Sequence, residues 1–417
     1  MRLLSLVVFL ALSLHAQPEP ETEILPGFRV ETLASVPGFV SSVVADSKGT
    51  IYCTTTNGWI HRIEGGQNVP VVSLPTRAGG NGGLLGMALL DDDTAVVHYT
   101  TWQEGGPFVL DDVIAEVELA TGALRVIKAF PGDIEFRERG VSDEHHGGNP
   151  IVAPDGSIFV GIGEYGVFAP AQDVRWNGGK IWRIDRDGNA EQFARGVRNP
   201  YDLAWDPLLG RLVFSDNGWH AGDEIHIIEA GANAGWPETY GNQPPFEGSV
   251  PPVYVFPDTV VPTGLARLSG ANALLGHGYF SCGFVTRAIY FFNDLGATPV
   301  APPVAVVSGF PQFILDVTEG PKGEVFFASA MGSNSSIHRL HVPSRGDCNG
   351  DGLTDARDIL PTMREVDDSN GGARIDAQNG DYRGSWGCDA NVDNVIDSAD
   401  VAAVVKLVSS RRRASRS

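Results

Sequence analysis

The chain has 417 residues, 42% of them hydrophobic, and a formal net charge of −21. This length allows one large domain and a small one, and the acidity argues against nucleic-acid binding, which needs a basic face. The 51 glycines and 27 prolines beside only 19% charged residues indicate a turn-rich all-β body rather than a helical bundle.

The N-terminus has the pattern of a signal peptide. One positive residue, Arg2, precedes a short apolar run that ends near Ala16. The run is too short to cross a bilayer, so we predict a signal peptide over residues 1–16, with an uncleaved anchor as the alternative. No later stretch is apolar enough for a membrane span. We therefore expect a secreted protein, placed in the periplasm, at the cell surface or outside the cell.

Four cysteines remain in a chain that is expected in an oxidising compartment. Four cysteines allow three pairings. Cys348 and Cys388 flank two equivalent loops, so we expect a disulfide between them. Cys53 and Cys282 lie in strand-like runs and are expected to be buried thiols.

One sequence phrase recurs six times along the body of the chain. An apolar run is followed by Asp, Pro or Gly residues, a short run with β propensity, a loop and a second such run. The copies span residues 43–63, 85–119, 151–184, 203–228, 264–292 and 317–340. Repeats spaced by about 40–60 residues, each with several short strands, are typical of propeller blades. The sequence therefore predicts an all-β, six-bladed β-propeller.

A pair of histidines stands directly before the third copy. His145 and His146 are followed by two glycines and a strand-like run that ends at Glu164. Histidine titrates near neutral pH, so at a strand entrance beside small residues it can remove a proton from a substrate. The alternative is a loop histidine that only hydrogen-bonds its neighbours.

The loops between the copies together resemble one known family. The phrases GGLLGMAL, HHGGNPIVAPDGSIFVGIGE, GGKIWRIDRDG, GVRNPYDLAWDP and DEIHIIEAGANAGWP resemble the soluble glucose/sorbosone dehydrogenases, which use pyrroloquinoline quinone (PQQ) to oxidise aldoses. The resemblance covers residues 24–340, and we place the propeller domain at residues 24–342. It implies PQQ and Ca²⁺ on one face of the propeller.

The resemblance also implies roles for three residues. His145 corresponds to the histidine that takes the proton from the anomeric hydroxyl of the sugar, while hydride passes to the quinone. Glu164 corresponds to the acidic residue that orients this histidine, which is usually Asp in the family. Arg198 corresponds to the arginine that polarises the reactive quinone carbonyl. A fixed cation suits a quinone that gains negative charge; an arginine paired with Asp202 or Glu191 is the alternative.

Cofactor and metal contacts are implied at further positions. Asn81 stands on the cofactor side, where the family often has Gln. The catalytic Ca²⁺ takes backbone carbonyls from the loop that corresponds to Gly218 and Trp219, and oxygen ligands of this kind suit a hard cation.

The chain departs from the family where the carboxylates of PQQ are bound. The family places an arginine pair at the entry to the sixth blade, and Phe313 and Leu315 stand at these positions here. Arg287 is the nearby basic residue, shifted in register. Because buried charge without a partner is costly, PQQ is held differently, another ligand is bound, or the site is vestigial.

Two acidic stretches near the C-terminus fit the twelve-residue calcium loop, whose ligands stand at positions 1, 3, 5, 7, 9 and 12. In the first loop these residues are Asp347, Asn349, Asp351, Leu353, Asp355 and Asp358. In the second they are Asp389, Asn391, Asp393, Val395, Asp397 and Asp400. Position 7 offers its backbone carbonyl. The regular spacing of oxygen ligands in both loops predicts two Ca²⁺ sites.

Apolar residues follow each loop at helical spacing. Two loop–helix halves with Asp at position 12 resemble a dockerin. The resemblance implies a small α-helical calcium-binding domain at residues 346–409, with EF-hand-type loops, that binds a cohesin-like scaffold protein. Such a domain has little core without its metal, so its folding should depend on Ca²⁺. Residues 410–417 are expected to be a basic, solvated tail.

The leading hypothesis is an exported, calcium-dependent oxidoreductase that oxidises aldose sugars or related alcohols with PQQ and is tethered by a dockerin-like module. The alternative is a non-catalytic propeller that binds carbohydrate or protein and has a degenerate cofactor site. A lactonase-like hydrolase is a weaker third reading, because the blades show no ring of inward acidic ligands.

Overall fold

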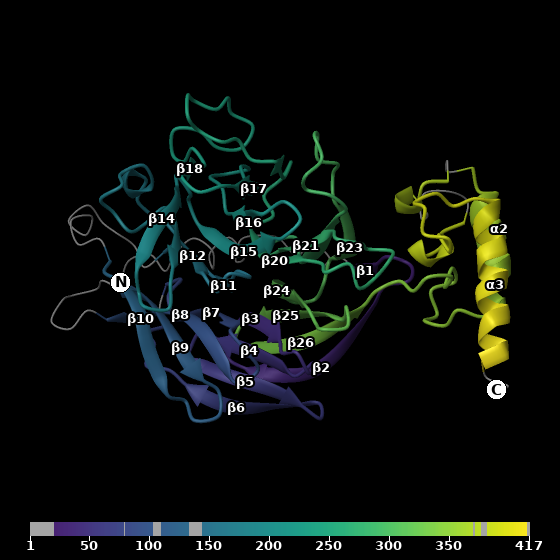
Figure 1. Ribbon diagram of the computed structural model, residues 1–417, viewed down its shortest axis with the longest axis horizontal. Coiled ribbons are helices and arrows are strands. Elements are labelled where there is room, and N and C mark those ends of the chain that lie inside the picture. The colour runs from purple at the N-terminus through teal and green to yellow at the C-terminus, as the bar shows by residue number, and fades with distance from the viewer. Residues whose placement is uncertain are drawn as a thin grey trace.

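The computed structural model describes residues 21–78, 80–102, 110–132, 144–369, 372–376 and 382–414. The expected signal peptide, residues 1–16, lies outside the described residues. Six sheets, antiparallel except for the parallel pairing of β14 with β18, surround a common centre, and a small helical unit lies to one side (Figure 1). The predicted six-bladed β-propeller is confirmed, and each of the six sequence copies falls in its own blade.

The first three blades follow chain order. Blade 1 contains β3 (Val40–Ala45), β4 (Ile51–Thr55), β5 (Trp59–Glu64) and β6 (Gln67–Ser73). Blade 2 contains β7 (Leu84–Leu89), β8 (Thr94–Trp102), β9 (Leu110–Glu118) and β10 (Leu124–Phe130). Blade 3 contains β11 (Ile151–Val152), β12 (Ile158–Ile162), β13 (Lys180–Ile184), β14 (Ala190–Arg195) and β18 (Ala232–Asn233).

The last three blades include the strands that close the ring. Blade 4 contains β15 (Pro200–Asp206), β16 (Arg211–Asp216), β17 (Glu224–Ile228) and β19 (Tyr254–Val255). Blade 5 contains β20 (Pro262–Arg267), β21 (Tyr279–Gly283), β22 (Ala288–Phe292), β23 (Val304–Ser308) and β1 (Glu23–Ile24). Blade 6 contains β24 (Phe313–Glu319), β25 (Val325–Met331), β26 (Asn334–His341) and β2 (Arg29–Pro37).

The recurring Asp–Gly phrase makes the tight turn between the first two strands of a blade. In blade 1, one carboxylate oxygen of Asp46 accepts hydrogen bonds from the amides of Lys48 at 2.9 Å and Thr50 at 2.7 Å. Gly49 has a φ of 87°, which a residue with a side chain rarely adopts. The turn chemistry therefore explains why the same phrase marks successive blades.

The ring is closed by pairing of the two ends of the propeller. Strand β2 pairs antiparallel with β26, from Arg29 opposite His341 to Pro37 opposite Asn334. A side-chain hydrogen bond also joins blade 6 to blade 1, because Asp316 on β24 accepts the amide of Val43 on β3 at 2.7 Å. Closure removes the exposed sheet edges that an open array would leave.

The six inner strands β3, β7, β11, β15, β20 and β24 line a cavity of about 540 Å³ along the axis. We call the face at which these strands begin the entry face. The loops that precede β11 and β15 carry His145 and Arg198, so the propeller brings these two loops to the same face. The blade cores are apolar and buried, which makes the blades a firm support for the loops.

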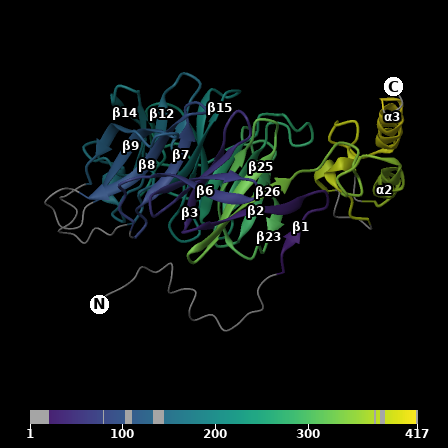
Figure 2. The ribbon, with the colours of Figure 1, turned by 90° about the horizontal axis from the view of Figure 1, so that it is seen from below.

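The C-terminal unit packs against blade 5, as two views show (Figures 1 and 2). It contains α2 (Ile359–Val366), α3 (Ser398–Ala414) and the short 3₁₀ turns η3 (Ala356–Asp358), η4 (Arg374–Asp376) and η5 (Trp386–Cys388); a further turn, η2 (Ala169–Ala171), lies in blade 3. The ring of Trp386 lies 5.4 Å from that of Phe28 and 5.3 Å from that of Phe291. The unit and blade 5 thus share one apolar core.

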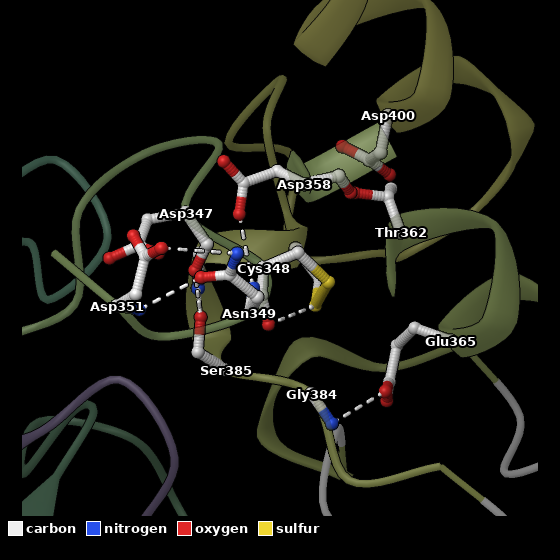
Figure 3. Close-up of a disulfide and its surroundings, with 12 residues drawn as sticks. Asp347, Cys348, Asn349, Asp351, Asp358, Thr362, Glu365, Gly384, Ser385 and Asp400 are labelled. Carbon is white, nitrogen blue, oxygen red and sulfur yellow. Dashed lines mark hydrogen bonds between the residues drawn. A yellow bond between two sulfur atoms is a disulfide. The ribbon is translucent and has the colours of Figure 1, made fainter. Parts of the chain in front are cut away.

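The cysteines are arranged as expected. Cys348 and Cys388 form a disulfide that joins the starts of the two acidic loops (Figure 3). Cys53 and Cys282 are free and fully buried, and burial raises the pKa of the Cys53 thiol to about 12. Helix α3 continues to Ala414, so the residues expected to begin a solvated tail at 410 are helical through 414. None of the described helices is long and apolar enough to span a membrane.

Candidate functional site

His145 and Glu164 are hydrogen-bonded at the entry face. The Nδ1 atom of His145 lies 2.6 Å from Oε1 of Glu164, whose side chain is fully buried. The second oxygen of Glu164 is buried and has no hydrogen-bond partner. An ionised carboxylate only accepts hydrogen bonds, so this contact places the ring proton of the neutral imidazole on Nδ1 and leaves the lone pair of Nε2 free to act as a base.

The guanidinium of Arg198 approaches the same imidazole from the neighbouring loop. Its NH2 group lies 3.4 Å from Nε2 of His145. Its NH1 group donates to the carbonyl oxygens of Asn217 at 2.7 Å and Gly218 at 3.0 Å. Because arginine only donates, its contact with Nε2 requires the same tautomer of His145 as the bond to Glu164.

Two tryptophan rings flank the Arg198 guanidinium. Its central carbon lies 5.4 Å from the ring centre of Trp219 and 5.6 Å from that of Trp236. Phe168 adds an edge-on contact to both indoles, at 5.3 Å and 5.1 Å. A cation held against aromatic faces in this way keeps its charge and its orientation.

The loop that carries His145 is packed too tightly for side chains at its glycines. A Cβ atom at Gly147 would collide with the carbonyl oxygen of Gly161, and one at Gly148 with that of Tyr201. The amide of Gly147 donates to the side chain of Asn199 at 3.2 Å. His145 itself has a φ of 58°, an unusual conformation for a residue with a side chain, and such strain is concentrated at functional sites.

Buried carboxylates hold the Arg198 loop from below. Asp216 accepts the amides of Arg198 at 2.8 Å and Asn199 at 2.6 Å. Burial, reinforced by the charge of Glu224, raises the pKa of Asp216 to about 7. Asp223 accepts the amide of Gly218 at 3.0 Å. These bonds fix the backbone from which the guanidinium and the Gly218 carbonyl project.

The remaining propeller residues singled out from the sequence also lie at the entry face. Asn81 precedes β7 and is exposed, and Arg287 lies in the turn between β21 and β22 with a φ of 51°. The carbonyl oxygen of Gly218 faces the Arg198 guanidinium, and Trp219 contacts that guanidinium with its ring. The structure therefore joins His145, Glu164, Arg198, Gly218 and Trp219 directly, whereas Asn81 and Arg287 belong to other blades.

The two positions expected to carry an arginine pair form apolar contacts. The ring of Phe313 stacks on that of Phe284, with centres 4.4 Å apart and planes 9° from parallel. Leu315 is 2% exposed and packs in the core between blades 6 and 1. Neither position can therefore balance a carboxylate.

The two acidic loops of the C-terminal unit repeat one hydrogen-bond pattern. The carboxylate at position 12, Asp358 or Asp400, accepts the amides of positions 3 and 9 at 2.8–3.1 Å. The carboxylate at position 1, Asp347 or Asp389, accepts the amide of position 6 at 2.9 Å and 3.0 Å. Gly352 and Asn394 at position 6 have φ values of 87° and 70°, as the tight turn requires.

Not every oxygen of the loop carboxylates accepts a hydrogen bond from the protein. One oxygen of Asp347 is buried without a hydrogen-bond partner, and burial together with the charges of Asp358 and Asp351 raises the pKa of Asp347 to about 6. Figure 3 shows Asp347, Asn349, Asp351 and Asp358 around one end of the loop. Within the part of the chain that the structure describes, however, no three His, Cys, Asp or Glu side chains converge as a metal cluster, because the carboxylates face loop amides.

Sequence reasoning missed the residues that support the site from behind. Asp112, Tyr165, Asn199 and Asp216 hold the two loops in place, and Asp112 stands about 30 residues before His145 in a different blade. Only the glycine pair after His146 signalled a crowded loop. The other contacts join blades, and no local pattern could have indicated them.

Known proteins resemble this chain in sequence and in fold. The family model described as Glucose / Sorbosone dehydrogenase matches residues 32–339. An aldose sugar dehydrogenase of Escherichia coli is 25% identical over 67% of this chain and 82% of its own length. An uncharacterised protein of Synechocystis is 26% identical over 47% of this chain, which spans only 56% of that relative's length. The PQQ-bound aldose sugar dehydrogenase of Streptomyces coelicolor has the same fold, with 24% identity, a TM-score of 0.62, and coverage of 78% of this chain and 99% of that structure.

Proposed function

The chain belongs to the glucose/sorbosone dehydrogenase family, and from that premise we propose that it oxidises an aldose sugar or a related alcohol with PQQ as the electron acceptor. The observation that carries this proposal is the convergence of a base and a cation at the entry face. His145 presents Nε2 beside the Arg198 guanidinium while Glu164 holds its other nitrogen. This pair can take a proton and stabilise negative charge within one small volume.

The residues around the Arg198 guanidinium fit a quinone. The Nε atom of Arg198 is buried without a hydrogen-bond partner, while NH1 donates to two carbonyls and NH2 faces Nε2 of His145, so the guanidinium has one donor that the protein does not use. When bound, PQQ supplies the two-electron acceptor for the hydride that leaves the carbinol carbon. The entry to blade 6 is different. Where the family places one arginine of a pair, this chain has Phe313, whose ring stacks on that of Phe284.

The roles of the protein side chains follow from their positions. Nε2 of His145 takes the proton of the substrate hydroxyl, and Glu164 stabilises the imidazolium that forms. Arg198 holds positive charge against developing negative charge. Because the two loops are anchored to rigid blades, His145 and Arg198 keep their separation without reorganisation during the reaction.

We further propose Ca²⁺ at two places. In the propeller, the carbonyls of Gly218 and Trp219 offer oxygen ligands beside the guanidinium. In the C-terminal unit, the repeated loop pattern and the unpartnered oxygen of Asp347 support one ion in each loop. The ion would draw the ligand side chains inward from the loop amides. Asn81 and Arg287 are proposed as further cofactor contacts on the same face.

The C-terminal unit is proposed as a dockerin-like attachment module of an exported protein. Support comes from its two loop–helix halves and from exposed apolar residues at position 7 of each loop, Leu353 and Val395, which are 57% and 45% exposed. A cohesin-like scaffold protein is the partner that fits this arrangement. Export, by the signal peptide at residues 1–16, would supply both the oxidising compartment for the disulfide and access to Ca²⁺.

The experiment is a titration of the purified apo-protein with PQQ and Ca²⁺, followed by dye reduction with a panel of aldoses. Stoichiometric PQQ uptake with aldose-dependent dye reduction, lost in His145→Ala, supports the proposal. A protein that takes up no PQQ and reduces no dye overturns it.

A second candidate function has its own supporting observation. The Phe284–Phe313 stack and the buried Leu315 stand where a tri-anionic cofactor would need cations. They favour a non-catalytic propeller that binds carbohydrate or protein at the entry face. Saturable carbohydrate binding by a protein that rejects PQQ would establish this alternative.

A further inference from the structure

A second hydrogen-bonded cluster lies directly behind the His145–Glu164 pair. It consists of His98 on β8, Asp112 on β9, His146 in the loop before β11, and Tyr165 after β12. All four side chains are at most 3% exposed. We call these four residues the Asp112 cluster. The roles proposed above for His145, Glu164 and Arg198 leave these four buried residues unused.

The carboxylate of Asp112 is the centre of the cluster. It accepts from Nε2 of His98 at 3.1 Å, from Nδ1 of His146 at 3.1 Å and 3.2 Å, and from the hydroxyl of Tyr165 at 2.9 Å. Although burial alone raises its pKa, the facing imidazole of His146 and that of His98 hold the pKa of Asp112 well below its usual range. Asp112 is therefore a buried anion.

His98 bridges this anion to a backbone carbonyl. Its Nε2 atom faces the Asp112 carboxylate, and its Nδ1 atom lies 2.8 Å from the carbonyl oxygen of Gly148. A carbonyl oxygen and an ionised carboxylate both accept hydrogen bonds only. Both ring nitrogens of His98 therefore face acceptors, and the ring links the Asp112 carboxylate to the backbone of Gly148.

The cluster touches the base and its orienting acid through their chain neighbours. His146 follows His145, and Tyr165 follows Glu164. His145 and Tyr165 both have left-handed backbones, with φ values of 58° and 57°, and neither is glycine. Conformations of this kind persist only where the surroundings hold them. Asp112 binds one residue on each side of the His145–Glu164 hydrogen bond, and it thereby fixes both backbones from one point.

We propose that Asp112 is a positioning residue, which sets the distance between His145 and Glu164 by anchoring His146 and Tyr165, with His98 as its further hydrogen-bond partner. The inference rests on the proposed function, because His145 is the base only if the protein is a dehydrogenase. Asp112 joins blade 2 to the catalytic loop of blade 3, so the alignment of the base depends on contact between blades. Misplacement of a reacting group by about 1 Å lowers rates on the order of a hundredfold.

The test uses Tyr165→Phe, which removes one hydrogen bond to Asp112 and no charge, together with His98→Gln and Asp112→Asn. Tyr279→Phe is the matched control for the tyrosine, because Tyr279 is 2% exposed and its hydroxyl binds the carboxylate of Asp206 in another part of the ring. His338→Gln is the control for the histidine, because His338 is buried in blade 6 and binds Ser329 at 2.8 Å.

The first measurement is steady-state oxidation of glucose by the full-length protein loaded with PQQ and Ca²⁺. We expect Tyr165→Phe to lower kcat by about tenfold or more with little change in KM, since the reacting base moves while substrate contacts stay. The pH profile of kcat should shift in the same variant. The Tyr279→Phe control should keep kcat and the pH profile of the unmodified protein.

The second measurement needs no cofactor. In apo-protein with ¹⁵N-labelled histidine rings, the His145 Nδ1 signal, assigned with His145→Gln, reports the bond to Glu164. We expect this signal to move in Tyr165→Phe and His98→Gln and to stay in both controls. Should Asp112→Asn not fold, these two milder variants still decide the question.

The outcomes separate the two proposals. A moved His145 signal in a protein that oxidises no sugar supports the cluster's positioning role and overturns the proposed function. An active protein in which Tyr165→Phe leaves kcat, the pH profile and the His145 signal unchanged overturns the positioning role. Equal losses in Tyr165→Phe and Tyr279→Phe also overturn it, because they would reflect general destabilisation.

Discussion

The Nε2 atom of His145 lies 3.4 Å from the guanidinium of Arg198, although the two residues are 53 positions apart and precede the inner strands of neighbouring blades. Glu164 binds the opposite nitrogen of the ring. The tautomer with its proton on Nδ1 and a lone pair on Nε2 satisfies both contacts. The predictions that follow start from this arrangement.

Removal of the base should abolish most of the activity. We expect His145→Ala to lower kcat by about 10²–10⁴-fold, the usual contribution of a general base. Glu164→Gln should cause a smaller loss, because an amide still accepts from Nδ1 but no longer stabilises the imidazolium. Glucose oxidation by the PQQ-loaded protein measures both. His341→Ala is the control, since His341 lies on the outer face of blade 6 beside Glu31; similar rates for His145→Ala and the control would contradict the role of His145.

Replacement of Arg198 by lysine should not preserve function. Lysine keeps the charge but cannot donate to two carbonyls and face His145 at the same time. We expect Arg198→Lys to reduce kcat by about tenfold or more and to weaken PQQ binding, measured by absorbance titration. Arg183→Lys provides the control, because Arg183 pairs with Asp155 and Glu191 at the protein surface. Unchanged kcat in Arg198→Lys would rule out a role for the planar guanidinium.

Removal of the Trp386 ring should destabilise both the C-terminal unit and blade 5. Trp386 is 2% exposed and lies between Phe28 and Phe291. We expect Trp386→Ala to cost about 3–5 kcal/mol of unfolding free energy, measured by chemical denaturation. Trp59→Ala is the control, since Trp59 is 39% exposed. If Trp386→Ala unfolds only the helical unit and leaves the propeller transition in place, the shared core is not a source of propeller stability.

Calcium should bind the acidic loops and stabilise the C-terminal unit. We expect Tb³⁺, used as a Ca²⁺ substitute, to show luminescence excited through Trp386, because Ser385 beside this ring hydrogen-bonds the Asp347 carbonyl. Asp358→Ala and Asp400→Ala should each remove one site, since each deletes the ligand at position 12. Addition of a chelator should lower the melting temperature of the unit. Full luminescence in the double variant would show that Tb³⁺ binds elsewhere.

Acidification should destabilise the protein through His338. Burial lowers the pKa of His338 to about 4, below the usual value near 6.5. Between these two pH values the unfolded chain binds a proton that the folded protein does not, so stability falls as pH falls from 6.5 to 4. The cost is roughly 3 kcal/mol at and below pH 4. The difference in unfolding free energy between wild type and His338→Gln, measured by chemical denaturation at several pH values, should therefore change across this window; a constant difference would contradict the role of His338.

Local sequence patterns were sufficient for the blades and for the cysteine pair. The Asp–Gly turns and short apolar runs act within a few residues of one another, so each blade could be recognised from its own copy. The sequence phrase that contains His145 and Glu164 could be recognised in the same way, because His145 precedes β11 and Glu164 follows β12, the next strand along the chain. Helix α3 continues past the predicted domain end at 409, through arginines that have no apolar pattern.

Contacts between distant segments were decided only by the tertiary structure. Asp112 reaches His146 from another blade, Trp386 enters a core built by Phe28 and Phe291, and Arg198 turns its guanidinium to the carbonyls of Asn217 and Gly218. Hydrogen bonding and packing act between atoms that are close in space, whereas the sequence displays only neighbours along the chain. The sequence by itself thus determined the repeating blades and the kinds of side chain at the entry face, and closure of the ring determined which of those side chains meet.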